Sequence, residues 1–330
     1  MLTTSLDLDK DGVQKGYIDV PVSLDLSAWS NQRVPIYSFK NAQGPSLLLL
    51  GGAHGDEFEA PVVLSNLANG GIDAANIHGQ VIIVPALNLP AVMNGSRLSP
   101  LDGGNMNRAF PGNPRGSATE RIADFVSREL ISRADVVLDL HSGGRSLRFL
   151  PSTIVPMQTT ETATGEIRAL AAAFDAPLTV ILREPQVETM IDTEVELQGK
   201  RILATELGGS GTLSQETLLV TRKGIDGVMR HMGLVAGPDN CDTTQCSKTV
   251  LVDGFHHYVY ADDAGIFEPL AGLGDRVREG DAVGRLHLVD RAETAPVAVK
   301  ARTTGFLFCT AGQGLVRRGD CISVIGHPVD

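Results

Sequence analysis

The length, composition and charge of the chain exclude several classes of protein. Its 330 residues are enough for about two domains, and 42% of them are apolar, so the chain can bury a core without a partner. A formal charge of -11 at pH 7 has the wrong sign for neutralising phosphates, which argues against nucleic acid or an anionic membrane as a partner. No apolar stretch approaches the roughly 20 residues that span a bilayer, no secretory signal is visible, and the four cysteines make no disulfide framework. We therefore expect a cytoplasmic globular protein.

Strand-like and helix-like segments alternate over the first 240 residues. A short apolar run at 46–50 is followed by a helical pattern that ends at residues 69–71, NGG. Ser117 and Glu120 form a capping box that opens another helix before the apolar run 136–140. Further segments continue the alternation: strands at 81–84, 178–182 and 202–205, and helices at 167–174 and 218–232. Alternation of this kind predicts an α/β fold with a mostly parallel central sheet flanked by helices.

The pattern changes after Gly237, where helical periods give way to short strand-like runs separated by glycine. We expect a linker at 241–248 and two domains, residues 1–240 and residues 241–330. Within the second domain, residues 265–281 are repeated in weaker form at 305–320, which predicts a small all-β domain with pseudo-twofold symmetry. This part resembles the barrel-sandwich fold of biotinyl and lipoyl domains, but no lysine stands at a hairpin tip as it does there. No covalently attached cofactor is therefore expected, and the predicted role of this domain is to pack against the larger one.

Three residues at the ends of predicted strands form a candidate metal site. In residues 51–57, GGAHGDE, His54 and Glu57 are three positions apart at a strand-to-helix turn, so both side chains can project to one side. His141 follows the strand 136–140, and ligands in open α/β sheets gather beyond the carboxyl ends of strands. Two histidines and one glutamate are the protein ligands of one type of hydrolytic zinc site, which leaves a fourth position for water. The spacing of His54 and Glu57 alone also occurs by chance.

Three motifs together resemble the succinylglutamate desuccinylase and aspartoacylase family, relatives of the zinc carboxypeptidases. They are HGDE at residues 54–57, NRAFPG at 107–112 and DLH at 139–141. Their order and strand contexts agree over about residues 45–235, and the family fold also implies a C-terminal β-domain. The runs DLHSGG at 139–144, ATELGGSG at 204–211 and RGDC at 318–321 are most similar to the ectoine-catabolism branch, whose members are N-acetyl-diaminobutyrate deacetylases.

This resemblance implies a zinc amidohydrolase that acts on linear amides. By position, His54, Glu57 and His141 would hold one Zn²⁺ per chain, which activates a water molecule. Glu206, at the end of the strand 202–205, would be the general base that takes a proton from that water and returns it to the departing amine. From the residues alone, Glu206 is equally consistent with a helix cap or an exposed loop residue.

The resemblance also assigns residues to substrate binding. Asn107 and Arg108 would contact the substrate, with the Arg108 guanidinium forming a forked pair with its α-carboxylate. Arg97 is the candidate that stabilises the oxyanion, and Arg115 competes with it because the spacing to Arg108 varies among relatives. Asp139 shares a strand face with the predicted ligand two positions later, so it either hydrogen-bonds that histidine or has a separate structural role.

Two further groups of metal-binding residue types are predicted to be structural. Cys241 and Cys246 are too few and too far apart for a closed zinc site. His256 and His257 could bind a metal in isolation, but adjacent residues on a strand face opposite ways, so this pair is predicted to hold no metal.

The expected reaction is removal of the acyl group from a small N-acyl amino acid. An acetyl-diaminobutyrate substrate carries an amine, for which an acidic stretch offers partners, although the same stretch is consistent with a solvated face: Glu184, Glu188, Asp192, Glu194 and Glu196. Succinylglutamate or acetylaspartate would use the same machinery with an extra cationic group for a second carboxylate. A non-catalytic binding protein on the same scaffold is the alternative from a different class. The sequence does not decide whether the chain forms a homo-oligomer.

Overall fold

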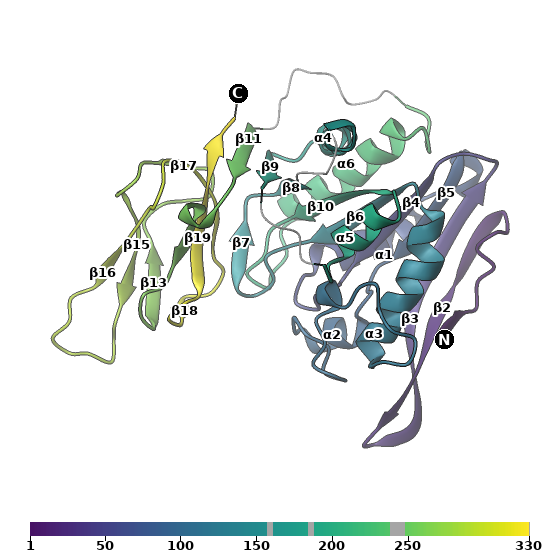
Figure 1. The fold of residues 1–330 in the computed structure, drawn as a ribbon, viewed down its shortest axis with the longest axis horizontal. Coiled ribbons are helices and arrows are strands. Elements are labelled where there is room, and N and C mark those ends of the chain that lie inside the picture. Colours follow the sequence, from purple (N-terminus) through teal and green to yellow (C-terminus); the bar gives the residue numbers. More distant parts are fainter. Residues whose placement is uncertain (157–160, 184–187, 238–247, 330) are drawn as a thin grey trace.

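The computed structural model describes residues 1–156, 161–183, 188–237 and 248–329. Figure 1 shows an α/β part, in which helices lie on both faces of a large sheet, and an all-β part formed by the C-terminal strands. The expected linker at 241–248 lies outside the described residues except for Lys248, as do Cys241 and Cys246. The division into two domains at this position therefore stays a prediction.

Four parallel strands form the centre of a 15-stranded sheet, in the order β5-β4-β6-β10. Their bounds are Ser46–Gly51 for β4, Gly79–Val84 for β5, Val136–His141 for β6 and Arg201–Glu206 for β10. Leu47 and Leu49 enter one core and Leu48 and Leu50 the opposite one, because side chains alternate along a strand and both faces are covered. The expected α/β fold with a mostly parallel central sheet is confirmed.

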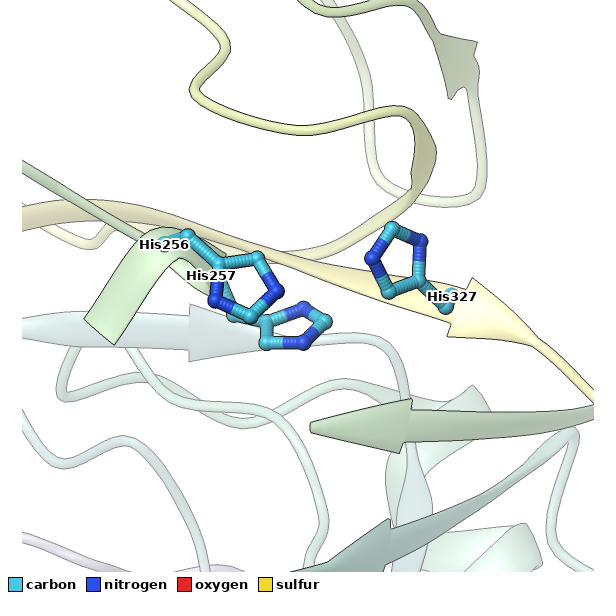
Figure 2. A group of neighbouring side chains, drawn as sticks. All are labelled: His256, His257 and His327. Carbon is cyan, nitrogen blue, oxygen red and sulfur yellow. The ribbon is translucent and has the colours of Figure 1, made fainter. Parts of the chain in front are cut away.

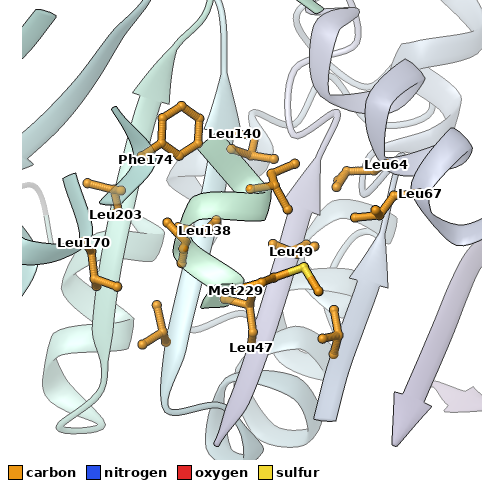
Figure 3. Close-up of a cluster of buried hydrophobic side chains, with 14 of the residues drawn as sticks. Leu47, Leu49, Leu64, Leu67, Leu138, Leu140, Leu170, Phe174, Leu203 and Met229 are labelled. Atoms are coloured by element: carbon orange, nitrogen blue, oxygen red, sulfur yellow. The ribbon is translucent and has the colours of Figure 1, made fainter. Parts of the chain in front are cut away.

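Helices cover the two faces of this sheet and create the two cores. The face that includes Leu47, Leu49 and Leu138 is covered by α1 (Glu59–Asn66), the π-turn η1 (Leu67–Gly71), α4 (Glu161–Phe174) and α6 (Gln215–His231), and Figure 3 shows Phe174 and Met229 packed there. The other face is covered by α3 (Ala118–Phe125), η4 (Val126–Leu130), η5 (Ile131–Arg133) and α5 (Ile191–Leu197). Three shorter helical segments complete this part: η2 (Ala74–Asn76), α2 (Leu89–Asn94) and η3 (Met106–Arg108).

The predicted capping box is present at the start of α3. The Ser117 hydroxyl accepts a hydrogen bond from the Glu120 amide at 3.3 Å, and the Glu120 carboxylate accepts one from the Ser117 amide at 2.8 Å. Two amides at the helix start that have no partner within the helix are satisfied in this way. The local sequence therefore sets where α3 begins.

Antiparallel strands extend the central sheet on both sides, which the sequence pattern did not predict for the N-terminal segment. On one side lie β1 (Thr3–Thr4), β2 (Gly12–Leu24) and β3 (Ser27–Asn41), with β3 antiparallel to β5. On the other side lie β8 (Ser152–Pro156), β9 (Leu178–Leu182) and β11 (Lys248–Val252), with β8 antiparallel to β10. Among the helices of the described residues, none is both long and apolar enough to cross a bilayer.

The predicted repeat in the C-terminal part is reflected in its strand pairing. The first copy gives β13 (Gly265–Pro269) and β14 (Arg276–Val277), and the second gives β17 (Gly305–Ala311) and β18 (Leu315–Val316). The pairing is reciprocal, because β13 pairs with β18 and β14 pairs with β17. The closing turns also match: the Asp281 carboxylate accepts from the Arg278 amide and the Asp320 carboxylate from the Arg317 amide, both at 2.8 Å.

The remaining strands belong either to the large sheet or to the 4-stranded sheet of the all-β part. They are β7 (Leu147–Phe149), β12 (Tyr258–Tyr260), β15 (Ala282–His287), β16 (Val297–Lys300) and β19 (Cys321–Pro328). The hydrogen bonds from β7 to β17, and from β11 to both β9 and β19, make the contact direct and confirm that the C-terminal part packs against the larger one.

The premise used for His256 and His257 is wrong. These residues form the 3₁₀ turn η6 (Phe255–His257) instead of a strand. Because a turn does not send neighbouring side chains to opposite faces, the two imidazole rings lie beside each other with centroids 4.2 Å apart.

Candidate active site

The loop between β4 and α1 carries His54 and Glu57, and a close backbone contact determines its path. Gly55 packs directly on α2, where an added Cβ would lie 1.9 Å from the carbonyl carbon of Ala91. Only glycine fits there without moving the α2 backbone. The tight loop buries His54 and Glu57 side by side, with 3% of each residue exposed.

The three predicted metal ligands converge. Glu57 Oε1 lies 2.7 Å from His54 Nδ1, and Glu57 Oε2 lies 2.8 Å from His141 Nδ1. His141 reaches this position from the end of β6, beside the loop, and its ring centroid is 4.9 Å from that of His54. One donor atom from each residue lies within 4.8 Å of the others, so these side chains could hold a metal ion.

The outward nitrogens of both imidazoles are bonded to oxygen atoms. His54 Nε2 donates to Asn105 Oδ1 at 3.1 Å, and His141 Nε2 donates to Asp139 Oδ2 at 2.9 Å. A proton held on Nε2 leaves the Nδ1 lone pair for a metal, and metal-bound histidines are commonly oriented by such contacts. Of the two roles considered for Asp139, the hydrogen bond to His141 is therefore the one that the structure contains. Asn105 was not predicted, and its only sequence signal is its place beside the motif at residues 107–112.

Glu206 ends β10 directly beside the end of β6, where it is the register partner of His141. Its Oε2 atom is buried and has no hydrogen-bond partner among the described residues. Burial raises the pKa of Glu206, the charge of Glu57 raises it further, and the opposing charges of His141 and Arg97 leave it at about 8. A buried carboxyl beside the metal-binding donors has the position and the proton affinity that a general base requires.

The two arginines predicted at the site both line the same cleft. Arg97 Nη1 lies 3.3 Å from His54 Nδ1 and 3.5 Å from Glu57 Oε1, so its guanidinium reaches two of the three predicted metal ligands. Arg108 Nη1 donates to the Asn107 carbonyl at 2.8 Å, and burial together with the charge of Arg97 lowers the Arg108 pKa. Arg115, the competitor of Arg97, is exposed and does not line the cleft.

The cleft has a volume of about 440 Å³ and combines the polar group with an apolar wall. The wall consists of Leu147, Phe149, Ile154, Leu182 and Met190. Asn107 also lines the cleft, with its amide nitrogen 3.4 Å from His141 Nε2. All seven predicted site residues therefore lie around one space, which is large enough for an acylated amino acid.

Among the members of the acidic stretch that the structure describes, Asp192 is the one that lines the cleft. Burial raises its pKa, as does the charge of Asp139, while His141 and Arg108 lower it, giving a value of about 6. Glu194 points elsewhere, since its Oε1 atom accepts from Ser127 at 2.6 Å. Glu188 is exposed, and Glu184 lies outside the described residues.

The charged groups around the cleft favour the binding of a cation. Burial alone would raise the pKa of Glu57, but the charge of His141 and hydrogen bonds to His141 and His54 lower it to about 2. Burial alone would lower the pKa of His141, but Asp139 and Glu57 raise it well above its usual range. Four carboxyl groups therefore line one cleft and would each interact favourably with added positive charge: those of Glu57, Asp139, Asp192 and Glu206. A divalent ion between two Nδ1 lone pairs and a carboxylate would supply it, and this donor set matches catalytic zinc sites.

Comparisons with known proteins agree with this geometry. Residues 43–232 match the model of the succinylglutamate desuccinylase/aspartoacylase catalytic domain. The chain is 41% identical over 331 positions to the N-alpha-acetyl-L-2,4-diaminobutyric acid deacetylase of Halomonas elongata, covering 100% of this chain and 96% of that protein. The product-bound structure of the ectoine utilization protein EutE (DoeB) from Ruegeria pomeroyi is 39% identical, with a TM-score of 0.94 over 99% of this chain and 98% of that one.

A second solved relative extends the agreement. The succinylglutamate desuccinylase/aspartoacylase structure from Rhodobacter sphaeroides is 35% identical to this chain, with a TM-score of 0.93 over 99% of both chains. The match therefore includes the C-terminal β-structure as well as the residues around the cleft. The chain belongs to the succinylglutamate desuccinylase/aspartoacylase family.

Proposed function

We propose that the protein is a zinc amidohydrolase that converts N-α-acetyl-L-2,4-diaminobutyrate and water into acetate and L-2,4-diaminobutyrate. The observation that carries this proposal is the convergence of His54, Glu57 and His141 next to the buried carboxyl of Glu206. The relative with 41% identity, which bears the name of this activity, supports the choice of substrate.

Two imidazoles and one carboxylate would hold the ion in this enzyme. His54 and His141 contribute Nδ1 and Glu57 contributes its carboxylate, with Asn105 and Asp139 fixing the rings. When bound there, zinc lowers the pKa of water towards about 7 and polarises the amide carbonyl. The positive charge of the ion would interact favourably with each of the four cleft carboxyl groups.

Glu206 moves the proton in the proposed reaction. Its carboxylate accepts the proton of the attacking water, and the carboxylic acid then gives this proton to the nitrogen of the departing amino acid. Burial raises the pKa of this carboxyl and so favours its protonated form, while a divalent ion beside it would lower the pKa and favour the ionised form. The group can therefore act as base and then as acid near neutral pH.

Arg97 would stabilise the oxyanion that forms at the acyl carbon. Its guanidinium lies within 3.5 Å of donor atoms of His54 and Glu57, so it stands next to the place where the carbonyl oxygen must lie. A preorganised charged donor at such a position is worth a few kcal/mol in the transition state.

The cleft offers complementary charges for both ends of the amino acid. Arg108 would pair with the α-carboxylate, and Asn107 beside it would contribute an amide. Asp192 would accept the side-chain ammonium of diaminobutyrate, because it is the cleft acid that lies outside the three donors, the Asp139 pair and the proposed base. Succinylglutamate and acetylaspartate present a second carboxylate, which Asp192 would repel.

A substrate comparison tests the function. The purified protein is stripped with a chelator, reloaded with zinc, and assayed for release of the acyl group from acetyl-diaminobutyrate, acetylaspartate and succinylglutamate. We expect zinc-dependent turnover with the highest kcat/KM on acetyl-diaminobutyrate. A higher kcat/KM on either dicarboxylic substrate would overturn the assigned specificity. If the zinc-loaded protein hydrolysed none of the three substrates, a non-catalytic binding protein would be favoured.

A further inference from the structure

Three histidines gather at the seam between the large sheet and the all-β part. His256 and His257 lie in η6, and His327 lies near the end of β19, opposite Leu251 of β11. Figure 2 shows the His256 and His257 rings beside each other and the His327 ring extending towards them from its strand. The ring centroid of His257 lies 4.2 Å from that of His256 and 4.7 Å from that of His327. One ring nitrogen from each of the three lies within 4.8 Å of the others.

A carboxylate completes the group. Asp253 Oδ1 lies 2.9 Å from His257 Nε2 and 3.6 Å from His256 Nε2. In a tetrahedral zinc site with bonds of about 2.0 to 2.1 Å, ligand atoms lie roughly 3.3 Å apart. The contacts of Asp253 with His257 and His256 are on either side of this spacing, so Asp253 is placed to join these two histidines as a ligand.

The buried ring of His257 is oriented as a metal ligand would be. Its Nδ1 donates to the Ile325 carbonyl at 2.6 Å, which leaves the lone pair on Nε2, the atom that faces Asp253. A lone pair next to a carboxylate oxygen requires a cation between them, either a proton or a metal ion. The same arrangement is found at the cleft, where an oxygen atom binds the outer nitrogen of each histidine and the inner nitrogen faces Glu57.

A metal ion accounts for more of this arrangement than a proton does. A proton on His257 Nε2 satisfies the contact with Asp253 but leaves the approach of the His256 and His327 rings without a function. The His327 ring is itself held in place, since its Nε2 lies 3.1 Å from the hydroxyl of the buried residue Thr303. The side chains of His256 and Asp253 are 50% and 35% exposed, so an ion can enter from solvent.

We infer that Asp253, His256, His257 and His327 form a second metal site, which takes a divalent transition-metal ion that prefers imidazole ligands, with Zn²⁺ the first choice. None of the four lines the cleft, and four protein ligands leave no open position for substrate, so the site is structural. By joining η6 to β19, the ion would stabilise the seam between the two parts of the protein. The inference does not depend on the proposed function.

Metal content tests the inference directly. The full-length protein is stripped with a chelator, reloaded with zinc, freed of unbound ion and analysed by elemental mass spectrometry. We expect two equivalents in the wild type, one in His256→Ala/His327→Ala and one in His54→Ala/His141→Ala. His287→Ala is the matched control, because His287 is paired with Glu268 on another strand of the same all-β part, and it should keep two equivalents.

The outcomes separate the two sites. A single equivalent in the wild type that is lost in His54→Ala/His141→Ala, or two equivalents in His256→Ala/His327→Ala, would overturn the second site. Two equivalents in the wild type that survive His54→Ala/His141→Ala would instead overturn the proposed catalytic site. A Co²⁺ titration of His54→Ala/His141→Ala gives a readout that does not depend on zinc recovery: visible bands of a four-coordinate ion should appear and should be lost when His256→Ala is added. Persistence of those bands would exclude His256 as a ligand.

Discussion

Asp139 Oδ2 accepts a hydrogen bond from His141 Nε2 at 2.9 Å, which places His141 between two carboxylates, because its Nδ1 faces Glu57 at 2.8 Å. The two contacts give the two ring nitrogens different roles. Asp139 holds the proton on the outer nitrogen, and the inner nitrogen is left to face the other donors. The next residue assists, since the Ser142 amide donates to Glu57 Oε2 at 3.1 Å and holds the carboxylate towards the ring.

Replacing Asp139 by Asn should therefore weaken metal binding without removing a ligand. An amide holds the Nε2 proton less strongly than a carboxylate, so we expect zinc affinity at the cleft to fall about 10- to 100-fold. Competition with a chromogenic chelator measures this, in a His256→Ala/His327→Ala background so that one site is observed. Unchanged affinity would mean that Asp139 does not orient His141.

Glu206→Gln should separate metal binding from proton transfer. Glutamine keeps the shape of the side chain but cannot accept the proton of water, so kcat should fall by roughly 10² to 10⁴ while zinc content stays at the wild-type level. Glu194→Gln is the matched control, because Glu194 is also a buried acid but hydrogen-bonds Ser127 away from the cleft. If Glu206→Gln turned over substrate at the wild-type rate, another group would have to carry the proton.

Asp192→Asn should change substrate preference and leave the chemistry intact. Loss of a charge-assisted contact is worth about 1.5 to 3 kcal/mol, so kcat/KM for acetyl-diaminobutyrate should fall roughly 10- to 100-fold, mainly through KM. N-acetyl-2-aminobutyrate, which lacks the side-chain amine, is the matched substrate and should be affected little. An equal loss on both substrates would indicate that Asp192 supports the cleft in general and does not recognise the amine.

The elements that could be predicted from sequence are those whose local pattern also determines their packing. The run at Leu47 to Leu50 is buried on both faces of the sheet, and the box formed by Ser117 and Glu120 satisfies amides within a single turn. Strands β2 and β3 were missed because many of their side chains are exposed or half-buried, so they contain no continuous apolar run.

The part of the candidate site that could be predicted from the sequence is the part formed by residues at the ends of strands. His141 and Glu206 end neighbouring parallel strands, and their register makes them meet. Asn105 is 51 positions from His54, and only the folded loop brings them together. Asp192 could not be singled out from its acidic neighbours, because the helical turn of α5 directs Glu194 away from the cleft. The premise behind the prediction for His256 and His257 failed for a related reason, since it placed them on a strand where the chain forms a 3₁₀ turn.

The raised pKa of Glu206 predicts a pH-dependent effect on the stability of the metal-stripped protein. Burial raises this pKa from the ordinary 4.5 to about 8, so the folded state binds the proton more tightly than the unfolded state does. The stability that this proton contributes is fully present below about pH 4.5 and is lost as the pH rises through 8. Glu206→Gln removes the cost of ionising the buried group, so the variant should gain stability relative to the wild type as the pH rises.

Urea unfolding of both stripped proteins at pH 5 and pH 9 measures this difference. The quantity compared is the free energy of unfolding of the variant minus that of the wild type. We expect this difference to be larger at pH 9 than at pH 5 by at least about 1 kcal/mol, since each unit of pKa shift corresponds to about 1.4 kcal/mol. Adding zinc should reduce the gap, because a cation beside Glu206 favours its ionised form. A stability difference that is the same at both pH values would show that Glu206 ionises in the folded protein as readily as it does in the unfolded chain.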